Sequence, residues 1–183
     1  MTTLNQTEIE DFWLRCFFNP GSSLKVAAID RAYRDFNRTL HKISEKQCKE
    51  KHAEAKKMML SLVEDVCLRK FQDQAEYDLW HQEKCLALKT LYRQVFDFGL
   101  YIGQAQKWIN MTFKYLSALG EKRIIGIETN YQYFHFPLDN IIQDMFFKEK
   151  GIKKLKGSWS RIDDYLIYLG LLMSRAKSFP LST

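Results

Sequence analysis

The chain has 183 residues, of which 46% are hydrophobic and 27% charged, and its formal net charge is +6. A chain of this length and apolar content can build a core without disulfides or a structural metal, so we expect residues 1–183 to form one domain. The basic balance suits polyanionic partners such as RNA, DNA or phosphorylated ligands.

Cysteine spacing and apolar runs indicate the compartment. The four cysteines include no Cys-x-x-Cys pair, and the N-terminus shows no basic stretch followed by an apolar run. We therefore expect reduced thiols, no signal peptide and a cytoplasmic protein. The longest apolar run, Tyr165 to Met173, is too short to span a bilayer, so we expect no membrane partner.

Residues 1–120 are predicted to form five consecutive helices. The first begins at Thr7, whose spacing to Glu10 is that of a capping box, and ends at the break Asn19-Pro20-Gly21. Apolar residues then recur at helical spacing in four further segments. We expect these helices over residues 23–44, 45–70, 74–98 and 103–119.

The last third of the chain combines an irregular segment with two more helices. Residues 121–136 are rich in β-branched and aromatic residues, which favours a long loop or a short hairpin. Pro137 suits the first turn of a sixth helix, and Ser160 with Asp163 predicts the cap of a last helix that ends near residue 177. This last helix is apolar nearly all round, which is typical of a central core element or an oligomer contact. The predicted fold is an all-α bundle of about six or seven helices.

The second predicted helix carries a basic face opposite its apolar one. The side chains on this face are Arg31, Arg34, Arg38, His41 and Lys42. Arginine donors fit phosphate geometry and histidine exchanges a proton near neutral pH, so the face is a candidate anion site. The alternative is a solvated face on which Asp35 pairs with a neighbouring arginine.

Part of this face resembles a known signature. Arg34-Asp35, five residues and then His41 is similar to the Arg-polar-x(4–6)-His motif of HEPN domains, which are helical bundles. Many of these are dimeric, metal-independent ribonucleases of bacterial toxin and defence systems. The resemblance implies that Arg34 holds the phosphodiester, that His41 acts as acid or base, and that Asp35 orients them. It also implies a homodimer and no cofactor.

The fifth predicted helix has no carboxylate, since none occurs between Phe98 and Gly120. Four polar side chains share one of its faces: Gln106, Lys107, Asn110 and Lys114. Donors without neighbouring acids are free for phosphates or bases, so we predict a nucleic-acid- or anion-binding ridge. Gly103 exposes amides at the helix start that add to it. The alternative is an amphipathic helix whose basic face is only solvated.

Two histidines suggest other chemistry. His81 and Cys85 lie one helical turn apart and suit a metal, yet no spacing supplies two further ligands. A packed Trp80 beside a hydrogen-bonded His81 is the preferred interpretation. His135 and Asp139 flank a proline at a predicted helix start. There we prefer the interpretation that Asp139 complements the helix dipole over one in which the pair approaches a substrate.

Missing motifs narrow the function. The sequence has no Walker-type loop, Gly-x-Gly-x-x-Gly, Gly-x-Ser-x-Gly or His-Glu-x-x-His, which argues against nucleotide hydrolysis, dinucleotide redox chemistry and zinc proteolysis. We expect a protein that engages nucleic acid, with RNA the leading candidate, and the resemblance adds metal-independent RNA cleavage. Two alternatives stay open. One is a non-enzymatic module that binds a protein partner, and the other is a sensor with a phosphorylated ligand between the second and fifth helices, lined by Arg34, Arg38, Lys107 and Asn110.

Overall fold

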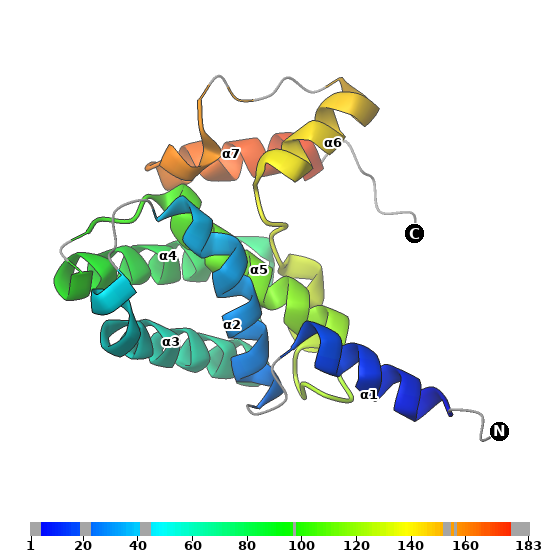
Figure 1. Ribbon diagram of the computed structural model, residues 1–183. Coiled ribbons are helices and arrows are strands. Elements are labelled where there is room, and N and C mark those ends of the chain that lie inside the picture. Colours follow the sequence, from blue (N-terminus) through cyan, green and yellow to red (C-terminus); the bar gives the residue numbers. More distant parts are fainter. Residues whose placement is uncertain are drawn as a thin grey trace.

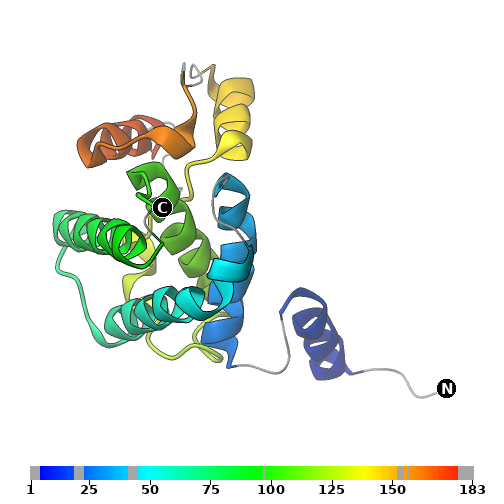
Figure 2. The same cartoon turned by 60° about the vertical axis from the view of Figure 1, so that its left-hand side comes forward.

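A computed structural model describes residues 5–18, 23–40, 45–96, 98–151, 155 and 157–176, and these residues form helices but no strand (Figures 1 and 2). The α-helices are α1 Gln6–Phe17, α2 Leu24–Phe36, α3 Glu45–Leu68, α4 Gln74–Phe96, α5 Ile102–Leu119, α6 Asn140–Lys150 and α7 Tyr165–Ala176. Three short 3-10 helices accompany them: η1 Asn37–Thr39, η2 Glu128–Tyr133 and η3 Trp159–Arg161. The predicted all-α bundle of about six or seven helices is confirmed.

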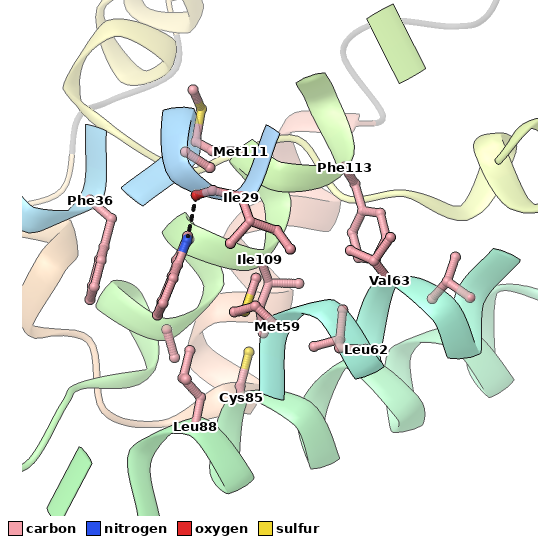
Figure 3. Close-up of a cluster of buried hydrophobic side chains, with 14 of the residues drawn as sticks. Ile29, Phe36, Met59, Leu62, Val63, Cys85, Leu88, Ile109, Met111 and Phe113 are labelled. Carbon is pink, nitrogen blue, oxygen red and sulfur yellow. Dashed lines mark hydrogen bonds between the residues drawn. The ribbon is translucent and has the colours of Figure 1, made fainter. Parts of the chain in front are cut away.

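α5 is the central helix of the bundle (Figure 1). Fourteen of its 18 residues are buried, and α2, α4 and η3 pack directly against it. The indole of Trp108 on α5 is fully buried and donates a hydrogen bond of 3.1 Å to the carbonyl oxygen of Ile29 on α2, as Figure 3 shows. Its ring stacks on Phe36, with 5.4 Å between the ring centroids. A buried indole N–H needs such an acceptor, so Trp108 fixes α5 against α2.

α7 is a peripheral helix and not the central element that its composition suggested. Tyr165, Tyr168 and Leu172 are buried, whereas Leu166 and Ile167 on the outer side are 72% and 57% exposed. The oligomer contact that the same composition predicted stays a prediction. No helix within the described part of the chain, α7 included, combines the length and apolar character that a membrane crossing requires.

The starts of α1 and α6 lie at other caps than those predicted. Asn5 caps α1 and forms a capping box with Glu8, two residues before the predicted start at Thr7. Asp139 caps α6 by accepting a hydrogen bond from the backbone of Ile142, so Pro137 precedes this helix instead of opening it. In both cases a side-chain acceptor that reaches an unpaired amide of the first turn decides where the helix begins.

The end of α2 and the start of α7 also differ from the prediction. α2 stops at Phe36 and η1 continues to Thr39, while residues 41–44 of the predicted helix lie outside the described part of the chain. At α7 it is Asp164, and not the predicted Asp163, that accepts from the first backbone amides. Asp163 instead forms an ion pair with Lys89 on α4.

Residues 121–136 form turns and η2, so the loop alternative is correct and the hairpin is not formed. This segment lies tightly against the end of α3. Gly126 has φ of +87°, and a Cβ atom at this position would lie only 2.0 Å from the carbonyl oxygen of Cys67. Only glycine fits such an approach in this backbone conformation.

Asn130 joins η2 to the C-terminal end of α3. Its buried amide donates to the carbonyl oxygens of Val66 and Arg69 at 2.9 and 2.7 Å, and its oxygen accepts from the backbone N–H of Phe71 at 3.1 Å. The last carbonyl groups of an α-helix have no partner within the helix, and Asn130 supplies one.

Asn130→Ala is expected to lower the free energy of unfolding by about 3 kcal/mol, because it leaves several backbone groups without partners in a buried position. Urea unfolding followed by circular dichroism measures the change. Thr129→Ala, at the exposed neighbouring position, is the control and should change stability by less than about 0.5 kcal/mol. Equal effects of the two substitutions would contradict the role given to Asn130.

Candidate functional site

The three residues of the predicted catalytic set have different environments. Arg34 is exposed on α2, whereas Asp35 is half-buried and accepts a hydrogen bond of 2.7 Å from the hydroxyl of Tyr115 on α5. Burial, together with the carboxylate of Asp35, raises the pKa of Tyr115 to about 12. His41 lies outside the described residues, so its approach to Arg34 stays a prediction.

The predicted ridge of free donors on α5 is wrong for three of its four side chains. Gln106, Lys107 and Asn110 are at most 5% exposed, and only Lys114 faces solvent. Gln106 donates to the carbonyl oxygens of Gly103 and Leu138, at 2.8 and 3.0 Å. Lys107 forms an ion pair with Asp139. The acid that is missing within the helix is thus supplied from 32 positions further along the chain.

The start of α5 is likewise closed. The backbone N–H of Gly103 donates to the carbonyl oxygen of Ile162 at 2.8 Å. A Cβ atom at Gly103 would lie 1.9 Å from the carbonyl oxygen of Trp159, so glycine is required here by the close approach of η3. The amide that was predicted to receive an anion therefore has an internal acceptor.

A buried chain of hydrogen bonds connects α4, α5, α7 and the segment before α6. It contains His81, Asn110, Tyr168, His135 and Asp78. His81 Nε2 donates to Asn110 at 2.9 Å, and the amide of Asn110 donates to the hydroxyl of Tyr168 at 2.9 Å. That hydroxyl lies 3.1 Å from His135 Nδ1, and His135 Nε2 donates to the carboxylate of Asp78 at 2.7 Å. Each donor has an acceptor, so the chain holds the helices together.

His81 confirms the packed, hydrogen-bonded interpretation. Burial lowers the pKa of His81 well below its usual value, and the nearby His135 lowers it further. The thiol of Cys85 lies 3.7 Å from His81 Nδ1, and burial raises the pKa of this thiol. Within the described ranges, no group of three or more His, Cys, Asp or Glu side chains is arranged to hold a metal ion.

The second and fifth helices do face a common cavity. It measures about 440 Å³ and is bounded by α2, η1, α5, the start of α6 and Trp159. We call it the basic cleft, after its charged lining of Arg38, Lys107, Lys114, Asp35 and Asp139. Of the residues predicted to line a phosphate pocket, Arg38 and Lys107 are present, whereas Arg34 and Asn110 are not part of the lining.

The charged side chains of the basic cleft differ in whether they have a partner within the described part of the protein. Asp139 is paired with Lys107, and Asp35 accepts from Tyr115. Arg38 and Lys114 are exposed and form no ion pair with any residue that the structure describes. Arg31 does not line the cleft, and its guanidinium lies 5.9 Å from the centre of the Tyr115 ring. Two cations at the mouth of one cavity are therefore available to an external anion.

Sequence reasoning missed several residues of the cleft, among them Tyr115 and Trp159. Tyr115 directly follows Lys114 in the fifth helix and is half-buried. Trp159 is an isolated aromatic residue in a segment that contains serines. This isolation was the only sign in the sequence that its side chain contributes to the cleft. Its ring lies 5.9 Å from the ammonium of Lys107.

Comparisons with known proteins supply no relative. The chain matches no family model, no curated protein and no solved structure. The basis for a function is therefore the geometry of the basic cleft and its surroundings.

His81 is expected to make stability pH-dependent. Its pKa is lowered in the folded state, so the unfolded chain binds an extra proton once the pH falls below about 6.5, and stability then falls with pH. Between about pH 6.5 and 5.5 this contributes a loss on the order of 1 kcal/mol. In His81→Gln that contribution disappears, so urea unfolding at both pH values should show a flatter dependence than in the wild type. An unchanged slope would contradict the prediction.

Proposed function

We propose that the protein binds RNA and that the basic cleft holds phosphate groups of the strand. The observation that carries this proposal is the unequal pairing in the cleft, where the two carboxylates have internal partners and Arg38 and Lys114 have none among the described residues. Arginine offers a planar fork of donors that matches phosphate oxygens, and lysine adds a mobile point charge. The net charge of +6 favours the approach of a polyanion over longer distances.

An extended polyanion fits better than a small phosphorylated ligand. Arg34 is exposed on α2, four residues before Arg38, and adds a cation outside the lining of the cleft. A row of cations that extends outside a cavity contacts successive phosphates of a strand, whereas a single phosphate group uses only the cavity. The two ligands share their chemistry, so competition with a mononucleotide and with inorganic phosphate separates them.

A protein-interaction module is the second candidate, and α1 is the observation that favours it. α1 extends away from the bundle (Figures 1 and 2), and none of its residues is buried. Phe12, Trp13 and Phe17 are each more than half exposed. Exposed aromatic residues on one helix are typical of protein contact sites. This function would be favoured if the protein showed no salt-dependent binding of RNA.

Removal of the two free cations should weaken RNA binding. Arg38→Ala with Lys114→Ala is expected to reduce affinity for a labelled oligouridylate about tenfold or more at low salt. It should also lower the slope of log affinity against log salt by about 0.7 for each lost phosphate contact. Fluorescence anisotropy over a salt series measures both quantities.

A matched control removes the same charge elsewhere. Lys70 and Arg93 are exposed and lie outside the basic cleft. The double variant Lys70→Ala and Arg93→Ala should keep the wild-type slope. If both double variants lose affinity equally, the attraction is a property of net charge, and the assignment to the cleft is wrong.

The resemblance carried by Arg34, Asp35 and His41 further predicts cleavage of the bound strand. Labelled RNA incubated with protein in EDTA should be cut, and His41→Ala should abolish cutting while affinity stays within about threefold of the wild type. Gel electrophoresis of the products and anisotropy provide the two readouts. A His41→Ala variant that cuts normally would refute the catalytic assignment without affecting RNA binding.

A further inference from the structure

A second cavity adjoins the basic cleft. It measures about 920 Å³ and is formed by α5, η2, the segment after η2 and α6. The two cavities share Lys114, Pro137 and Ile142 in their linings. Figure 1 shows the chain after η2 passing from α5 towards α6. Both volumes lie within the range of about 300–1,000 Å³ that is usual for ligand sites.

The lining of the second cavity is aromatic. Tyr131 is 62% exposed, and Phe134 and Phe136 are half-buried. Phe134 stacks on the buried ring of Phe113, with 4.7 Å between centroids and 26° between planes. Tyr131 meets Phe134 edge to face, 6.4 Å away and at 75°. Phe134 is thus held in place by Phe113, whereas the ring of Tyr131 is exposed to solvent.

Polar groups border these rings. Gln132 is exposed on η2, and the hydroxyl of Ser117 is buried without a hydrogen-bond partner among the described residues. The cavity therefore combines aromatic surface with a few polar groups, among them the exposed carboxylate of Glu128, and Lys114 places a cation where it meets the basic cleft.

We propose that this aromatic cavity binds a nucleobase of the strand whose phosphates contact Arg38 and Lys114. A nucleobase has an aromatic face that stacks on aromatic side chains and a polar edge that forms hydrogen bonds, and its phosphate lies a short distance away. The aromatic cavity and the adjoining cations of the basic cleft have the same arrangement. A purely apolar peptide segment would leave Lys114 without a role. The inference rests on the proposed RNA binding and adds the recognition of bases.

The test compares two strands with equal charge. One is a short oligoribonucleotide and the other an abasic strand of the same length, so the phosphates are the same and only the bases differ. We expect the wild type to bind the base-bearing strand at least about fivefold more tightly. Tyr131→Ala should reduce this preference severalfold and leave the salt slope unchanged, whereas Tyr131→Phe should keep both. Tyr101→Ala removes an exposed tyrosine outside the cavity and should behave as the wild type.

The outcomes separate the two proposals. Equal binding of both strands, with a salt slope that still depends on Arg38 and Lys114, would overturn base recognition and keep phosphate binding. Salt-insensitive or absent binding of both strands would overturn RNA binding itself. A preference for bases that persists in Tyr131→Ala would place the base outside this cavity and would also overturn the inference.

Discussion

The burial of α5 imposes the constraint that the rest of the structure satisfies. This helix carries Gln106, Lys107 and Asn110 on a side that is covered by other segments, and each of these side chains is at most 5% exposed. A buried polar group without a partner costs roughly 1–3 kcal/mol, and a buried unpaired charge costs more. The segments that cover α5 must therefore bring complementary groups, and this requirement selects how the C-terminal third of the chain packs.

The partners come from several parts of the chain and determine the cavities. Leu138 supplies backbone groups to Gln106, and Tyr168 on α7 receives the amide of Asn110. Asp139 both caps α6 and neutralises Lys107, so one carboxylate sets the start of a helix and its position against α5. Because α6 begins there, its first turn forms a wall of the basic cleft and of the aromatic cavity. The proposed site is thus a consequence of how the polar side of α5 is covered.

The helices were largely predictable from the sequence, because apolar periodicity acts locally, whereas the capping residues of α1, α6 and α7 were not. How deeply each helix is buried could not be predicted, because burial depends on segments that are distant in the chain. The fifth helix was interpreted as an exposed ridge that binds nucleic acid or another anion, since no acid occurs between Phe98 and Gly120, yet Asp139 reaches Lys107 from outside that interval. The apolar composition of the last helix predicted a central core element or an oligomer contact, and the central position is wrong because Leu166 and Ile167 face solvent.

The site could be predicted only in part, for the same reason. That Arg38 and Lys114 are cations on two helix faces is visible in the sequence, but their convergence on one cavity depends on the packing of α2 against α5, which Trp108 and Ile29 hold together. The packing also divides the cations by role. Lys107 compensates Asp139 inside the fold, so its removal would leave a carboxylate with little solvent and no counter-charge. Arg38 and Lys114 are exposed and compensate no carboxylate among the described residues, so the fold does not require them. These two exposed cations, beside carboxylates that already have partners within the protein, are the feature on which the proposed binding of an anion rests.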